Sequence, residues 1–246
     1  MYRYQILIEY DGTKFIGWQI QKKGKTIQGL IQRKFSRILK EKIILTAAGR
    51  TDTGVHAHEQ SAHFDCKKRI NQLGKFLKSM NYFLNKDGIA ILKIKKKINS
   101  FHARFSAKLR IYQYNIINRL SAPVLEKNRA WHIIKKLDLE LMKKGAKKLI
   151  GTKDFSTFKA SSCKAKSPIR TMKLVKIKST KNIIKIEFRS QSFLQQQVRS
   201  MVGCLKYLGE KKWTLKKFES VLKLKKRALC APPAPPEGLY LKRVIY

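Results

Sequence analysis

One short segment of the chain combines the residue types that nucleophilic chemistry requires. Residues 49–57 read Gly-Arg-Thr-Asp-Thr-Gly-Val-His-Ala, which places the carboxylate of Asp52 in a turn between two glycines. Glycine permits the unusual backbone angles of a tight bend, and Arg50 would keep Asp52 ionised, as a nucleophilic carboxylate must be. An aspartate in such a turn also commonly caps the backbone, so the residues alone leave both interpretations open.

Two further positions have side chains suited to RNA. Arg110, Tyr112 and Tyr114 share one face of a predicted strand. A tyrosine that faces a cleft can stack on a base taken out of its helix. Alternatively, such a tyrosine is a partly buried residue of the strand with a structural role only. Arg199 stands among apolar residues of a predicted helix, where it either extends to solvent or pairs with an inward carboxylate.

Two other segments have competing interpretations. His56, His58 and His63 lie close together, but their spacing matches no helical histidine pair, and no cysteine stands at ligand spacing, so we expect no metal site. Residues 11–19 read Asp-Gly-Thr-Lys-Phe-Ile-Gly-Trp-Gln. Such a loop either contacts RNA by stacking and charge or packs against the protein.

The charge of the chain favours a polyanionic partner. The sequence has 56 Lys plus Arg against 15 Asp plus Glu, a formal net charge of +41 over 246 residues. A field of this sign attracts nucleic acid, and we expect RNA as the partner. The four cysteines are scattered without a Cys-x-x-Cys pair, which argues against a disulfide framework and fits a reducing cytoplasm. We expect no signal peptide and no membrane-spanning segment.

Hydrophobic periodicity predicts strands and helices without a strict βαβ rhythm. In the first half it predicts a strand that buries Tyr4, Ile6, Ile8 and Tyr10, a helix capped by Thr26, strands at 42–45 and 60–64, a helix at 73–84 and a buried strand at 89–94. In the second half it predicts a strand at 110–118, a helix capped by Asp138, a hairpin of 171–178 with 182–189, a helix at 194–208, a helix capped by Thr214 and a closing strand at 238–246.

These elements predict an α+β fold of two sheet-and-helix halves. We place the N-terminal half at residues 1–105 with the Asp52 loop, and the C-terminal half at 106–246 with Tyr112 and Arg199. We expect a basic cleft between the halves, because such a cleft suits a nucleic acid.

Read together, the segments resemble the TruA family of tRNA pseudouridine synthases. The resemblance covers nearly the whole chain and rests on stretches in the family's order, namely 10–19, 48–57, 101–107, Arg110 with Tyr112 and Tyr114, 154–155 with 167–171, 193–194 with 198–199 and 202–203, and 238–241. The chain departs from the family at Gln195 and Gln196, where histidines are usual, at Ala231-Pro-Pro-Ala-Pro-Pro, where Thr-Ala-Pro-Ala is usual, and in 81–89, which lacks an expected proline.

The resemblance implies the pseudouridine synthase fold and the isomerisation of uridine to pseudouridine at positions 38 to 40 of the tRNA anticodon stem-loop. It implies that Asp52 is the catalytic carboxylate, acting at uracil C6, at ribose C1′ or on the C2′ proton. Tyr112 then stacks on the flipped base, Arg199 pairs with the aspartate, and Arg50 helps to hold the nucleotide out of the stack. No cofactor is implied, and the family acts as a homodimer.

Two rival functions remain at this stage. A non-catalytic RNA-binding protein would explain the charge and the aromatic residues, but it gives no reason for Asp52, Tyr112 and Arg199 to occur in this order. An acid–base enzyme acting on a small phosphorylated substrate would need a glycine-rich phosphate loop or a second matched carboxylate, and the sequence offers neither.

Overall fold

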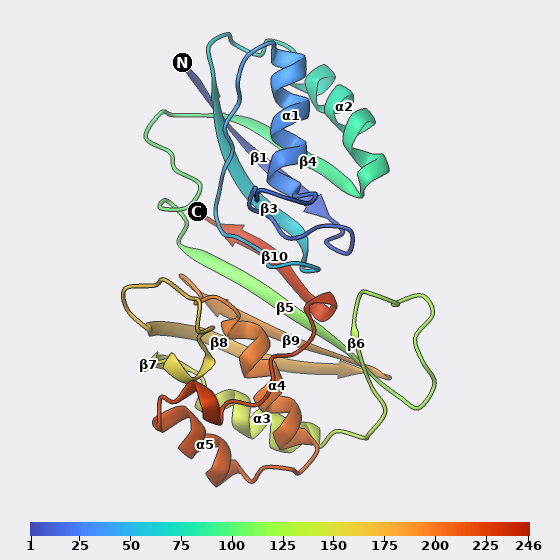
Figure 1. The fold of residues 1–246 in the computed structure, drawn as a ribbon, viewed down its shortest axis with the longest axis vertical. Coiled ribbons are helices and arrows are strands. Elements are labelled where there is room, and N and C mark those ends of the chain that lie inside the picture. The colour runs from blue at the N-terminus through green and yellow to red at the C-terminus, as the bar shows by residue number, and fades with distance from the viewer. The chain divides into compact units, whose positions relative to one another are not determined.

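A computed structural model describes residues 1–246. The chain forms two compact units, Met1–Lys108 with Tyr240–Tyr246, and Leu109–Leu239. Each unit combines a sheet with helices (Figure 1), so the expected α+β class is confirmed. No helix is both long enough and apolar enough to cross a bilayer.

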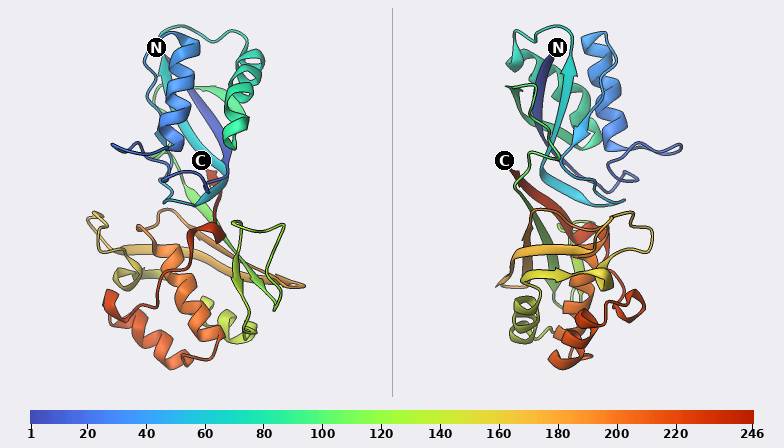
Figure 2. Two further views of the ribbon diagram at one scale, coloured as in Figure 1. Left: turned by 45° about the vertical axis from the view of Figure 1, so that its right-hand side comes forward. Right: turned by 90° about the vertical axis from the view of Figure 1, so that its left-hand side faces the viewer.

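The first unit is a mainly antiparallel sheet with two helices. Its elements are β1 (Tyr2–Tyr10), α1 (Ile27–Leu39), β2 (Thr46–Ala47), β3 (His56–Cys66), α2 (Leu73–Leu84), the 3-10 turn η1 (Asn85–Asp87), β4 (Ile89–Lys97) and β10 (Leu239–Ile245). The strand order is β4-β1-β3-β10, with β2 paired to β3. The pairing of β10 with β3 is parallel, whereas β1 pairs antiparallel with β3 and β4. Helices α1 and α2 lie side by side on one face of this sheet (Figures 1 and 2).

The second unit has the sheet order β5-β9-β8-β7, with β6 paired to β5. Its elements are β5 (Leu109–Asn118), β6 (Trp131–Ile133), α3 (Leu139–Lys148), β7 (Gly151–Asp154), η2 (Ser156–Phe158), β8 (Ile169–Thr180), β9 (Ile183–Ser190), α4 (Gln197–Gly209), α5 (Leu215–Lys223), η3 (Arg227–Leu229) and η4 (Pro236–Gly238). The predicted hairpin is confirmed as β8 and β9, which pair antiparallel. Helices α3, α4 and α5 pack against one another, and α3 packs on β8.

The helix starts follow the predicted caps. The side-chain oxygens of Thr26, Asp138 and Thr214 accept hydrogen bonds from the first-turn amides of α1, α3 and α5. These bonds satisfy donors that a helix cannot pair internally. Amphipathic spacing and a capping residue together therefore place these three helices.

The predicted strand at 42–45 is wrong. The strand begins later, at Thr46, because side chains of α1 take the backbone amides of the predicted segment. The amide of Leu45 donates to Gln32 Oε1 (2.9 Å), and that of Ile43 donates to Ser36 Oγ (2.9 Å). A backbone held by a neighbouring helix has no need of a sheet partner.

The start of one helix and the burial of one strand also differ from the predictions. Helix α4 begins at Gln197 rather than 194, because Gln196 has a left-handed backbone with φ of 59°. Strand β4 buries Ile89 and Ile91 but exposes Leu92 and Lys93. Since β4 is the edge of its sheet, it is only partly buried, as edge strands commonly are.

Chain order alone does not give the placement of the closing strand. Residues 240–246 belong to the first unit, where Tyr240 and Leu241 pair with His56 and Ala57 of β3. The hydroxyl of Tyr246 donates to the Ala103 carbonyl at 2.8 Å. The assignment of Asp52 to a half that ends at residue 105, and of Tyr112 and Arg199 to a half that begins at residue 106, remains a prediction.

Candidate active site

Asp52 lies in the loop that joins β2 to β3. The amide of Val55 donates to the Asp52 carbonyl at 3.2 Å, which closes a tight turn over residues 52–55. Gly54 has a φ of 75° within it, a backbone angle that favours glycine. Asp52 is half-buried, while Arg50 is exposed. The loop therefore presents a carboxylate near the surface beside a cation that can reach a ligand.

A second loop, residues 11–20, holds the Asp52 turn in place. The hydroxyl of Tyr10 lies 2.8 Å from Thr51 Oγ1, with both side chains buried. The Trp18 amide donates to the Thr51 carbonyl at 3.0 Å, and the Gly54 amide donates to the Phe15 carbonyl at 3.4 Å. The two amide contacts hold the backbone on both sides of the carboxylate, and Tyr10, the last residue of β1, holds the Thr51 side chain.

Two glycines allow the loops to approach this closely. A Cβ on Gly12 would lie 2.1 Å from the Val55 carbonyl oxygen, and one on Gly17 would lie 2.8 Å from the Thr51 carbonyl oxygen. Gly17 also has a φ of 102°. Any larger side chain at either position would push the Asp52 turn away.

The segment 11–19 is thus a packed loop. Phe15 and Trp18 are 1% and 2% exposed, so neither ring is presented for stacking on a base. Lys14 is exposed. The alternative in which both aromatic rings stack on RNA does not fit this burial, and the aromatic residues instead support the Asp52 loop.

His56 fastens the end of the Asp52 turn. Its Nδ1 accepts a hydrogen bond from the Gly12 amide at 3.0 Å. Asp11 Oδ1 lies 3.3 Å from the same nitrogen. The rings of His56 and His58 stack on Tyr240 with centroid distances of 4.7 and 4.8 Å.

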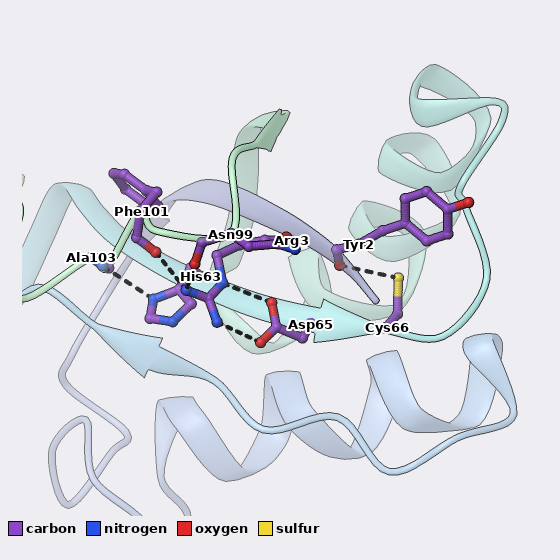
Figure 3. A network of polar contacts seen from close by, with 8 residues as sticks. All are labelled: Tyr2, Arg3, His63, Asp65, Cys66, Asn99, Phe101 and Ala103. Carbon is purple, nitrogen blue, oxygen red and sulfur yellow. Dashed lines mark hydrogen bonds and ion pairs between the residues drawn. The ribbon is translucent and has the colours of Figure 1, made fainter.

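His63 belongs to a different network of the first unit (Figure 3). Its Nδ1 accepts from the Ala103 amide at 3.1 Å. Nearby, Arg3 makes a two-pronged contact with Asp65, with distances of 2.8 and 2.7 Å, and donates to the Phe101 carbonyl at 2.8 Å. These bonds fasten the segment around Phe101 to the sheet. The structure contains no group of three or more His, Cys, Asp or Glu that could hold a metal ion.

Tyr112 lies on β5 in the second unit, opposite Phe188 of β9. The residue is 8% exposed, and its ring meets Phe193 edge to face with a centroid distance of 5.0 Å. Tyr114, on the same face, is fully buried and donates to the Pro235 carbonyl at 2.7 Å. Burial raises the pKa of Tyr114 well above its ordinary value. Tyr114 is therefore a core residue, whereas Tyr112 keeps a small exposed area.

Arg199 lies in the first turn of α4 and is half-buried. Its Nε donates to the Ala234 carbonyl at 2.7 Å, and the Ala234 amide donates to the Arg199 carbonyl at 2.9 Å. The proline-rich segment 231–236 thus positions the guanidinium. No local sequence pattern indicates this contact, because 35 residues separate its partners.

The four predicted site residues are divided between the units. Arg50 and Asp52 share one loop of the first unit, and Tyr112 and Arg199 lie on β5 and α4 of the second. Sequence reasoning missed Tyr10 and Gly17 as supports of Asp52. The only available signal was that both belong to the stretch 10–19, which carries part of the resemblance.

Comparison with known proteins gives a consistent result. A sequence model of the family described as tRNA pseudouridine synthase matches residues 6–106 and 146–246. The tRNA pseudouridine synthase A of Pelagibacter ubique (strain HTCC1062) is 70% identical over 246 residues, covering all of both chains. The proteins of the same name from Sinorhizobium medicae and Xanthobacter autotrophicus are 40% and 42% identical, also over the full length of both chains.

Proposed function

The chain belongs to the tRNA pseudouridine synthase family and is an isomerase, and from this premise we propose that it converts uridine to pseudouridine at positions 38 to 40 of the tRNA anticodon stem-loop. The reaction detaches uracil from C1′ and rejoins it through C5. Substrate and product are isomers, so the conversion requires neither an energy source nor a redox cofactor. Family membership favours this function over RNA binding alone.

The observation that supports Asp52 most directly is the fixed geometry of its loop. Hydrogen bonds from the Trp18 and Gly54 amides hold the backbone on both sides of the carboxylate, and the Tyr10 hydroxyl pairs with Thr51 Oγ1. A reacting group that is already in place loses little freedom when the substrate arrives, which lowers the barrier. In this proposal Asp52 is the catalytic nucleophile.

The other three residues have roles implied by the family pattern. Tyr112 stacks on the flipped base, Arg50 helps to hold the nucleotide outside the helix, and Arg199 is the cation that the pattern assigns to the catalytic carboxylate. Removing a base from its stack costs a few kcal/mol, which phosphate contacts of the basic chain can offset. The basic cleft, the homodimer and the cytoplasmic location remain predictions.

The test is Asp52→Asn, which keeps the size of the side chain but removes the nucleophile. We expect tritium release from tRNA labelled at uridine C5 to fall by about three orders of magnitude or more. Gel-shift affinity for the same tRNA should stay within about threefold, because a single neutralised carboxylate changes few phosphate contacts.

The matched control is Asp87→Asn, since Asp87 lies outside the Asp52 loop and pairs with Lys25. This variant should release tritium at the parent rate. Turnover near the parent rate in Asp52→Asn would contradict the assignment of Asp52. Tight tRNA binding by the parent chain without any tritium release would instead support the binding-only alternative.

A further inference from the structure

The fold brings together two cysteines that are distant in the sequence. Cys204 lies in α4 and Cys230 follows η3, and their sulfur atoms are 3.5 Å apart although 26 residues separate them. Cys204 is fully buried, while Cys230 is partly exposed. Neither is in a disulfide.

The surroundings distinguish the two thiols. Arg227 lies beside Cys230 and donates to Ser200 Oγ at 2.8 Å. The hydrogen bond from Cys204, together with the positive charge of Arg227, lowers the pKa of Cys230. The hydrogen bond to Cys230 and burial raise the pKa of Cys204. Reactive cysteines are characteristically partly exposed, near a cation and beside a second thiol.

We propose that Cys204 and Cys230 form a redox-active dithiol that a hydroperoxide oxidises reversibly to an intramolecular disulfide. The site lies outside the residues assigned to the isomerisation, and the proposal does not depend on that reaction.

The chemistry requires two steps. Cys230 attacks the hydroperoxide R–O–OH, the O–O bond breaks, and Cys230 becomes a sulfenic acid while an alcohol R–OH is released. Cys204 then attacks the sulfenic sulfur, and the S–S bond forms with the loss of one water. In total, two thiols and one hydroperoxide give a disulfide, an alcohol and water. Two equivalents of a small thiol reverse the oxidation by exchange.

Little movement is needed to form the bond. The sulfurs must close from 3.5 Å to about 2.05 Å. The chain after Cys230 already rests on α4, since a Cβ on Gly203 would lie 2.0 Å from the Pro232 carbonyl oxygen, and Ala234 exchanges two hydrogen bonds with Arg199. A disulfide would fasten this segment covalently to the helix that carries Arg199.

The test uses the full chain with Cys66→Ser and Cys163→Ser, which leaves only the proposed pair. After treatment with hydrogen peroxide and alkylation, peptide mapping should find a single Cys204–Cys230 disulfide that dithiothreitol reverses. Because the disulfide closes a loop, the Tm should rise on the order of 5 °C in the oxidised form, and exchange of the Ala234 amide should slow.

Two single variants assign the roles of the thiols. In Cys204→Ser, Cys230 should accumulate as a sulfenic acid that dimedone traps. In Cys230→Ser, the buried Cys204 should resist peroxide. Failure of the folded double variant to form the disulfide under excess peroxide would overturn the proposal, as would exclusively intermolecular crosslinks. Dimedone labelling of Cys204→Ser no faster than that of Cys163 in the parent chain would overturn the assignment of Cys230 as the attacking thiol.

Discussion

The loop that carries Asp52 is supported by residues that carry no charge. Tyr10 supplies a buried hydroxyl 2.8 Å from Thr51 Oγ1, and Gly17 allows the backbone of one loop to lie against the other. A buried hydroxyl pair is worth about 1 kcal/mol of net stability. The effect on positioning a reacting atom can be larger than that figure suggests, because a small displacement reduces the rate steeply.

Tyr10→Phe tests this support directly. The change removes one oxygen and leaves the ring, so we expect kcat to fall about tenfold with KM nearly unchanged. The matched control is Tyr4→Phe, because Tyr4 lies on the same strand as Tyr10. This change removes the hydrogen bond that the Ile70 amide donates to Tyr4 Oη. Steady-state tritium release should distinguish them, and equal kcat losses in both variants would show that the effect is general destabilisation.

Gly17→Ala and Gly74→Ala should have opposite effects on stability. At Gly17 the positive φ and the 2.8 Å approach to the Thr51 oxygen predict a loss on the order of 2 kcal/mol. Gly74 lies in α2 with no atom within 4 Å of the added carbon, so alanine there should add about 0.5 to 1 kcal/mol. Urea unfolding measures both, and a neutral Gly17→Ala would refute the proposed close contact.

At this scale the sequence indicated candidate site residues but not the residues that support Asp52. Asp52, Tyr112, Arg50 and Arg199 came from the order of motifs, and their roles remain proposals. The contact of Tyr10 with Thr51 spans 41 residues, and no local pattern indicates a contact of that range. Local capping bonds such as that of Thr26 were predictable because both partners lie within one helical turn.

Strand β3 has a pH-sensitive residue at its buried face. Burial and the nearby charge of Arg3 lower the pKa of His63 to about 4, whereas an unfolded histidine titrates near 6.5. Between these values the unfolded chain binds the extra proton. The stability due to neutral His63 is therefore complete above about pH 6.5 and is lost as the pH falls through about 4.

We expect the free energy of unfolding to drop on the order of 2 kcal/mol between pH 7 and 4.5 on account of His63. His63→Asn retains an acceptor for the Ala103 amide but cannot titrate, so it should flatten most of this dependence. The pKa of His102 is also lowered, chiefly by burial. In His63→Asn this residue should therefore leave a smaller dependence of the free energy of unfolding on pH, with the same sign. Urea titrations at several pH values provide the measurement, and an unchanged slope in His63→Asn would contradict the assignment.

At the scale of elements, helices and strands were predicted correctly where hydrophobic periodicity and a capping residue agreed. The prediction failed where side chains of one element formed hydrogen bonds with the backbone of another. Helix α3 was predicted from its buried stripe and its Asp138 cap, and it is observed at Leu139–Lys148. The segment 42–45 has strand-like residues, but Gln32 and Ser36 of α1 bind its amides. Such competition depends on tertiary placement, which a local pattern does not contain.

For the molecule as a whole, the net charge of +41 predicts how RNA binding responds to salt. Each phosphate contact releases counterions, so affinity should fall on the order of a thousandfold between about 50 and 200 mM salt. Filter binding of tRNA over this range measures the slope. Asp52→Asn should show the same slope as the parent chain, and salt-independent binding would contradict an electrostatic origin.

The strand β10 has a consequence for the order in which the chain is made. Residues 240–246 complete the sheet that carries the Asp52 loop, through the pairing of β10 with β3 and the hydrogen bond from Tyr246 to Ala103. A ribosome synthesises Asp52 early but releases this strand only after the entire second unit. The first unit consequently stays unfinished throughout translation, so that a nascent or prematurely terminated chain carries the Asp52 loop without the strand that completes its sheet.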